Sequence, residues 1–157
     1  MRTLPVAALV ILLLSCDSKP SAPEPTPAPK VVSTPKPADE SRRFPKANRL
    51  STIVVDKELL GKRFMPGGTL GQYRKGKTEY EIFVARVATS TDAALLLPDW
   101  EHALTDAKFI PSFGGYFGRD AGRPVFVFTK GPWIAGIAGL PERDADRIAR
   151  DLAKALE

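Results

Sequence analysis

Residues 125–139 read VFVFTKGPWIAGIAG, two apolar runs separated by Gly131-Pro132. Short apolar runs bounded by turn residues are typical of strands buried on both faces of a sheet. We therefore predict strands at 125–130 and 133–138, joined by a tight turn into an antiparallel pair. We favour central strands that the chain itself covers on both sides. The alternative is one face left apolar and exposed, which would mark a binding surface.

Working toward the N-terminus, residues 78–87 alternate with period two and are rich in β-formers, which predicts a strand. One face would carry Tyr80, Ile82 and Val84, and the other would carry Glu81, Phe83, Ala85 and Val87. Shorter candidate strands are 70–74, 109–110 and 116–117, with 52–55 as a strand or an extended lead-in. Turns or loops are expected at 67–68, 75–77, 114–115 and 120–124, where glycines cluster.

Two helices are predicted. Thr89, Ser90 and Asp92 supply an N-terminal cap for the first, which would run to about residue 106 with a break or kink at Pro98. The second spans 141–156, where proline suits the first turn. Its apolar side chains recur at helical spacing and form one stripe, made of Ala145, Ile148, Ala149, Leu152 and Leu156.

Strands, a helix, several strands and a helix, linked by short connections, predict an α+β fold. We expect an antiparallel sheet of about five or six strands with two main helices, in a single domain over 49–157. This length can bury a stable core without a disulfide or a metal ion.

The chain opens with Met1-Arg2, runs apolar from residue 3 to 14, and then reads Leu13-Leu14-Ser15-Cys16. This pattern resembles the signal of a bacterial lipoprotein, in which a lipobox ends at the cysteine that is acylated. The apolar run is too short to span a bilayer, which needs about 20 residues. We expect a signal peptide over 1–15 and lipidation of Cys16; the alternative is an ordinary signal peptide with an incidental cysteine.

Cys16 is the only cysteine, so the chain cannot form an internal disulfide. The lipoprotein resemblance implies three acyl chains on this residue, which would fix the protein to the cell envelope facing the periplasm. Asp17 resembles the signal that retains lipoproteins in the inner membrane, and it favours that membrane over the outer one. The membrane is thus the expected partner of the N-terminus.

Residues 16–48 contain the lipidated cysteine and a proline-rich stretch with few bulky apolar side chains, so we expect a disordered tether. Eight of the fifteen prolines lie here: Pro20, Pro23, Pro25, Pro27, Pro29, Pro35, Pro37 and Pro45. Proline favours extended geometry, so the inferred role is to hold the domain away from the bilayer. The alternative is a polyproline ligand for a partner.

The hairpin at 125–131, the strand at 133–139 and the following helix resemble the end of a class of small uncharacterised extracytoplasmic bacterial domains. The segment Leu70-Gly71-Gln72-Tyr73-Arg74, the next strand and the Thr89-Ser90 helix start are similar to their first half. The resemblance supports the fold and implies no activity.

The sequence contains no recognisable catalytic motif. His102 is the only histidine, and we interpret it as a surface residue beside Asp99 and Asp106 and not as a metal ligand. Ser112 lacks the context of a nucleophile elbow. Without Arg2 of the signal peptide, 22 basic and 18 acidic side chains leave a formal net charge of +4, which is too small to indicate nucleic acid. No cofactor fingerprint is present.

We therefore expect a non-enzymatic accessory or binding module that contacts an envelope protein or a small ligand. Its candidate contact residues are Phe113, Tyr116, Phe117, Arg119 and Trp133. The alternative hypothesis is an envelope hydrolase that uses Asp or Glu with Arg119 or His102. The oligomeric state is left open.

Overall fold

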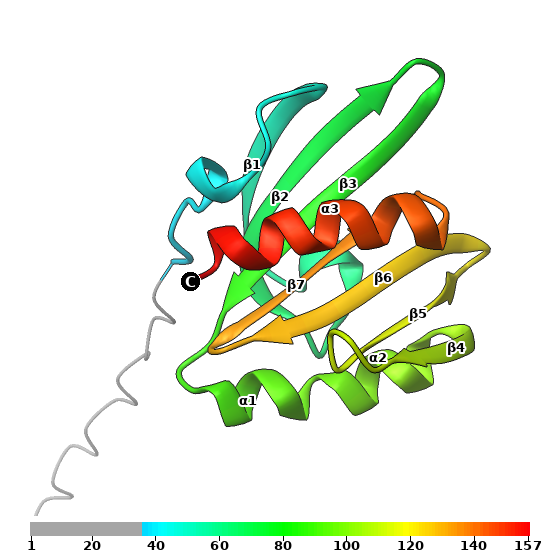
Figure 1. Ribbon diagram of the computed structural model, residues 1–157. Helices are drawn as coiled ribbons and strands as arrows, with labels where there is room; N and C mark the ends of the chain where they lie inside the picture. Colours follow the sequence, from blue (N-terminus) through cyan, green and yellow to red (C-terminus); the bar gives the residue numbers. More distant parts are fainter. Residues whose placement is uncertain (1–35) are drawn as a thin grey trace, which may run out of the picture. The chain divides into compact units, whose positions relative to one another are not determined.

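The computed structural model describes residues 36–157 (Figure 1). Seven strands form one antiparallel sheet in the order β1-β2-β3-β7-β6-β5-β4. The strands are β1 (Arg49–Lys57), β2 (Pro66–Lys75), β3 (Thr78–Arg86), β4 (Thr105–Ile110), β5 (Gly115–Asp120), β6 (Arg123–Lys130) and β7 (Trp133–Ala138). The α+β class and the antiparallel sheet are confirmed, with more strands than the five or six expected.

The sheet consists of two meanders. The β1–β2–β3 meander joins the β4–β5–β6–β7 meander where β3 pairs with β7, with Val84 opposite Ala135. The strand pair at 125–138 therefore lies in the middle of the sheet, as its unbroken apolar character predicts. Only the strands at the two ends, β1 and β4, have an unpaired edge within the described residues.

Helices cover both faces of the sheet (Figure 1). The helices α1 (Ser90–Leu95) and α2 (Leu97–Ala103) link β3 to the far strand β4 along one face. The C-terminal helix α3 (Glu142–Ala155) packs on β6 and β7 across the other face. Each face therefore has its own core, and the interpretation of 125–138 as strands covered on both sides is confirmed.

The core under α1 and α2 is centred on Trp100, which is fully buried. Its ring lies 5.9 Å from that of Phe83 and 5.4 Å from that of Phe64, edge-on to the latter. The indole N–H donates to the Met65 sulfur at 3.2 Å. The predicted cap is present, because Thr89 and Asp92 form a capping box at α1. Pro98 lies in the first turn of α2, which accounts for the predicted break.

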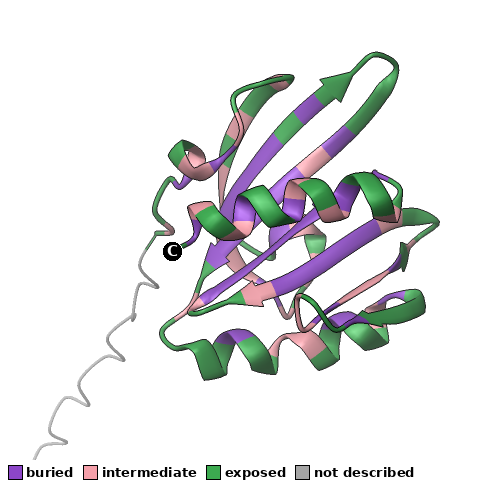
Figure 2. Ribbon diagram, viewed as in Figure 1, coloured by how far each residue is buried: buried purple, intermediate pink, exposed green. Residues whose placement is uncertain are grey.

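The core under α3 contains the predicted apolar stripe of that helix. Ala145, Ala149, Leu152 and Leu156 are buried against side chains of β3, β6 and β7, and Ile148 is half-buried (Figure 2). Acidic side chains in the first turn and Lys154 in the last complement the helix dipole.

Two expectations about the first half of the chain are corrected. Residues 67–68 do not form a turn but lie within β2, because backbone from β1 and β3 approaches both glycines too closely for a side chain. The folded part also begins before residue 49. Glu40 and Phe44 are buried, and a short 3-10 helix η1 (Ser41–Arg43) lies between them.

The segment 36–48 packs on the sheet mainly through one aromatic side chain, that of Phe44. Phe44 lies over Gly71 of β2, where an added Cβ would meet its ring at 2.8 Å. Its exposed fraction is 3%. The Glu40 amide donates to the Thr69 hydroxyl at 2.9 Å, which satisfies a buried backbone group. The folded domain therefore begins before the boundary expected at residue 48. The composition of this segment is poor in apolar residues and did not indicate that a single phenylalanine packs on the sheet.

Candidate functional site

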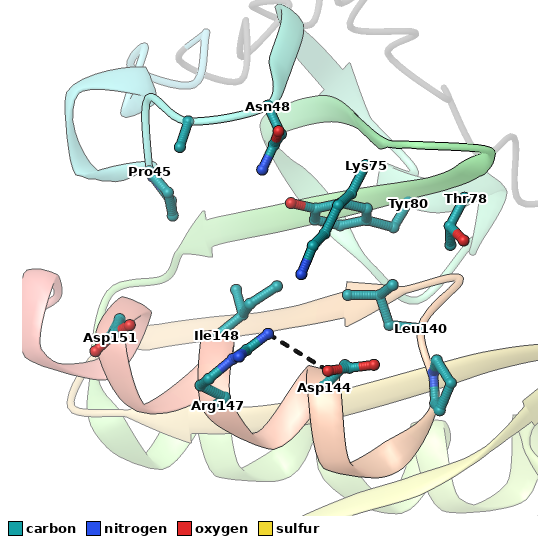
Figure 3. A pocket seen from close by; sticks show the side chains of 12 residues that line it. Pro45, Asn48, Lys75, Thr78, Tyr80, Leu140, Asp144, Arg147, Ile148 and Asp151 are labelled. Carbon is teal, nitrogen blue, oxygen red and sulfur yellow. Dashed lines mark hydrogen bonds and ion pairs between the residues drawn. The ribbon is translucent and has the colours of Figure 1, made fainter.

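Two separate pieces of chain cover the α3 face of the sheet, and a groove lies between them (Figure 3). The segment 45–48 forms one wall, and α3 forms the other. The cavity has a volume of about 470 Å³ and is mostly apolar. We call it the α3 groove. Its lining residues are Pro45, Ala47, Asn48, Lys75, Thr78, Tyr80, Leu140, Pro141, Asp144, Arg147, Ile148 and Asp151.

Tyr80 of β3 lies on the floor of the groove. Tyr80 is buried, with only 6% of its surface exposed. Figure 3 shows the ring along the floor, with the hydroxyl directed toward the space between Asn48 and Ile148. None of the side-chain hydrogen bonds of residues 36–157 uses this hydroxyl, and no buried polar atom there is left unsatisfied. The hydroxyl therefore opens into the groove and is free to bond to a ligand.

The electrostatics keep Tyr80 neutral at physiological pH. Burial raises the pKa of its hydroxyl, and the positive charge of Arg147 opposes that increase in part. A neutral tyrosine is both a donor and an acceptor. Arg147 itself lines the groove from α3.

Tyr73 lies behind Tyr80 and fixes it in place. The two rings are stacked with centroids 5.0 Å apart. The Tyr73 hydroxyl donates to the Pro45 carbonyl at 2.8 Å, so it also holds the wall. Burial raises the pKa of Tyr73 to about 12, with a smaller opposing effect from Arg49. One tyrosine is thus committed to structure, whereas its neighbour presents an unused hydroxyl.

The charged groups around the groove are not all paired. Arg147 contacts Asp144 at 3.4 Å, and Lys154 contacts Asp151 at 3.6 Å, both on exposed surface. Lys75, at the end of β2, forms no ion pair with any carboxylate of the described residues. Its ammonium extends over the groove in Figure 3.

Arg43 fastens the N-terminal wall to α3. It donates to the Ala155 carbonyl, forms an ion pair with Glu40 at 2.9 Å, and lies 4.7 Å from the centre of the Trp133 ring. These contacts connect η1 to the C-terminal end of the helix. The width of the groove is therefore set by packing on both of its walls.

The five candidate contact residues do not form a common surface. Phe113 and Phe117 are half-buried on the α3 face, against Phe126. Tyr116 lies on the opposite face, where a hydrogen bond with Glu101 raises the pKa of its hydroxyl. Arg119 is exposed on β5.

Trp133, the fifth of these residues, is not available to a ligand on that surface. It is 4% exposed and belongs to the core under α3. Arg43 and Arg86 lie over its ring, at 4.7 and 5.4 Å from the ring centre.

No hydrogen bond or ion pair in residues 36–157 joins His102 or Arg119, the residues proposed for a hydrolase, to the nearby acids Asp99 and Asp120. His102 and Asp99 are exposed on α2. Asp120 is held by Lys62 at 2.7 Å and so has a structural partner. Ser112 is exposed in the turn between β4 and β5, and that part of the chain holds no group of three potential metal ligands. Cys16 and Asp17 lie outside the described residues.

Sequence reasoning did not find the groove. Its lining comes from three stretches that are far apart in the chain, at 45–48, 75–80 and 140–151. The one available signal was Tyr80, which the alternation places on the same face as the later helix stripe. An aromatic hydroxyl on an otherwise apolar strand face requires either a partner or an opening to water.

Comparison of the chain with models of protein families, with curated proteins and with solved structures found no match. Within residues 36–157, no helix has the length and apolar character needed to cross a membrane.

Proposed function

We propose that this protein is a lipid-anchored, non-enzymatic binding module of the bacterial cell envelope, and that the α3 groove is its binding site. The observation that carries the binding role is the groove itself. It combines an apolar lining with the Tyr80 hydroxyl, which opens into the groove and takes part in no side-chain hydrogen bond of residues 36–157. Pockets with a mostly apolar surface and a few convergent polar groups are typical ligand sites.

The anchor is inferred from the sequence. The apolar run followed by Leu13-Leu14-Ser15-Cys16 supports acylation of the cysteine, and Asp17 favours the periplasmic side of the inner membrane. The prolines between residues 20 and 37 support a spacer that holds the domain away from the lipid. A module on such a spacer would bind molecules or proteins that pass near the membrane.

Binding is favoured over hydrolysis by the residues that line the groove. A hydrolase needs a nucleophile or an activated water with a base beside it. The two acids of the groove, Asp144 and Asp151, lie beside basic side chains on exposed surface. Among residues 36–157, no side-chain hydrogen bond joins the Tyr80 hydroxyl to a base, so its chemistry there is that of a hydrogen-bond partner.

The anchor is tested by the mass of the mature N-terminus. Protein extracted from membranes should begin at Cys16 and carry acyl chains. The Cys16→Ser variant should be unprocessed or soluble. A wild-type protein that retains Met1 and carries no fatty acid would contradict the anchor and leave the groove unaffected.

The binding role is tested by native mass spectrometry of the full chain after gentle extraction. A small molecule should be retained by the wild type and lost in Ala47→Trp, which fills the groove from its exposed wall. The matched control is Ala94→Trp, at an exposed position of α1 on the other face of the sheet. A retained molecule that Ala94→Trp loses and Ala47→Trp keeps would place binding elsewhere.

A further inference from the structure

The α3 groove has one ammonium, that of Lys75, that forms no ion pair within the described residues. Asp144 and Asp151 each have a basic partner, whereas Lys75 has none. Lys75 is exposed at the rim, and its ammonium extends over the groove (Figure 3). A single anionic group could pair with this ammonium, whereas a cation would be repelled by it.

Three hydrogen-bond donors from three different elements, one of them the Lys75 ammonium, line the groove. They are the ammonium of Lys75 at the end of β2, the hydroxyl of Tyr80 on β3, and the guanidinium of Arg147 on α3. Arg147 uses one nitrogen for Asp144 at 3.4 Å, which leaves further N–H groups available. Because burial raises the pKa of Tyr80, its proton stays in place as a donor. Convergent donors bind an acceptor, and a carboxylate accepts several hydrogen bonds at once.

The rest of the lining is suited to an apolar body. Leu140 and Ile148 lie on the floor and the helical wall, and Pro45, Ala47 and Pro141 add apolar surface. The volume of about 470 Å³ lies in the range of small-molecule sites. This size suits a small molecule, and the one unpaired ammonium matches a single carboxylate.

We propose that the α3 groove binds small organic monoanions that have an apolar body and one carboxylate. The carboxylate would accept hydrogen bonds from Lys75, Tyr80 and Arg147, and the body would pack on Leu140 and Ile148. This inference rests on the proposed binding role and adds the chemical class of the ligand. It requires no catalytic step and no metal ion.

The experiment compares three probes that share one body and differ only in the head group. These are 4-phenylbutyrate, 4-phenylbutan-1-ol and 4-phenylbutylamine, which are an acid, a neutral alcohol and a cation. The full chain is labelled at isoleucine and leucine methyl groups, and each probe is titrated while NMR follows Ile148 and Leu140. The exposed methyl groups of Ile53 on β1 report non-specific binding. Phenylbutyrate should shift the groove methyls in a saturable manner and bind about tenfold tighter than the alcohol, since a hydrogen bond to a charged group adds that much.

Two variants and a matched control assign the head group to its donors. Tyr80→Phe should weaken phenylbutyrate binding about tenfold, because the hydroxyl is recessed from solvent. Lys75→Gln should weaken it about fivefold, as expected for a charge at a rim that water reaches. Lys77→Gln removes a charge from the same turn without touching the groove lining and should leave affinity unchanged. Tyr80→Phe and Lys75→Gln should each leave the affinity for 4-phenylbutan-1-ol nearly the same.

Each other result overturns one specific statement. Equal binding of acid and alcohol, or tighter binding of the amine, would exclude the monoanion while keeping the groove as a binding site. Equal losses in Lys75→Gln and Lys77→Gln would reduce the selectivity to general attraction and reject the proposed contacts. No shift of Ile148 or Leu140 with any probe, together with no retained molecule in native mass spectrometry, would reject the binding role itself.

Discussion

The two faces of the sheet are covered in different ways. On one face, α1 and α2 link β3 to β4 and, together with residues 59–65, bury Trp100 completely. On the other face, α3 and the segment 36–48 cover the strands from opposite ends of the chain. The first face contains a closed core, whereas the second contains a groove along the line where the two coverings meet.

The comparison shows how a small α+β domain gains a site without a catalytic motif. Around Trp100 the covering side chains pack closely, so their contacts serve stability. On the other face, α3 and residues 45–48 leave a seam, and the strand residue beneath the seam is only partly satisfied. Tyr80 occupies that position, while Phe83, three residues later, lies in the closed core.

The largest expected effect is on the closed face. Trp100→Ala removes the indole from its contacts with Phe64 and Phe83 and leaves a cavity, so the free energy of unfolding should fall by about 4 kcal/mol. Ile148→Ala, at a half-buried position of the groove, should lower it by only about 1 kcal/mol. Urea denaturation measures both. Equal losses would mean that the two faces do not differ in the way the structure indicates.

Phe44→Ala tests the second covering. The side chain is buried over Gly71, and its removal should lower the free energy of unfolding by about 3 kcal/mol. Lys46→Ala, at an exposed position two residues later, should change it by less than about 0.5 kcal/mol. If Phe44→Ala were as mild as its control, the segment before residue 49 would act only as a tether.

Alkaline pH should loosen the grooved face. The folded-state pKa of Tyr73, about 12, lies above the value of 10 for a free tyrosine. Its contribution to stability is therefore complete below pH 10 and is lost as pH rises through 12. Between pH 9 and pH 11.5 the free energy of unfolding should fall by about 2 kcal/mol.

Tyr73→Phe provides the control for this pH dependence. At neutral pH it should lose about 1 kcal/mol, because the Pro45 carbonyl loses its donor. Its stability should then fall less steeply with pH than that of the wild type. Urea midpoints at several pH values measure the slope, and parallel curves for the two proteins would show that Tyr73 does not titrate as the structure indicates.

Much of the fold could be predicted from local patterns. The alternation at 78–87, the unbroken apolar runs at 125–138 and the stripe of the last helix each specify an element by themselves. The pattern could not specify that Gly67 and Gly68 belong to a strand. Their role depends on the approach of β1 and β3, which is a property of the assembled sheet.

The candidate site could not be predicted from local patterns. The groove exists because Phe44 holds residues 45–48 against β2 at a distance from α3, and both facts depend on tertiary packing. The aromatic residues around 113–117 were predicted as one contact surface because they are close together in sequence. In a strand, successive side chains point to opposite faces, so Tyr116 and Phe117 contribute to two different cores.

The smallest expected effect concerns the connection between the two coverings of the grooved face. Arg43→Ala removes the hydrogen bond to Ala155, the ion pair with Glu40 and the contact with Trp133, so the free energy of unfolding should fall by about 1 kcal/mol. Hydrogen exchange should increase more than this loss implies at the amides of Arg43 and Phe44, because the wall opens locally before the sheet unfolds.

Arg42→Ala is the matched control. The Arg42 guanidinium is exposed and lies 3.7 Å from the same glutamate, farther than that of Arg43. It should leave both stability and exchange nearly unchanged. Comparison of the two variants separates the effect of the Arg43 contacts from that of losing a basic charge in η1. If Arg43→Ala accelerated exchange throughout the sheet and not at the wall, the segment 36–48 would be an integral part of the core, and the seam would have no mobility of its own.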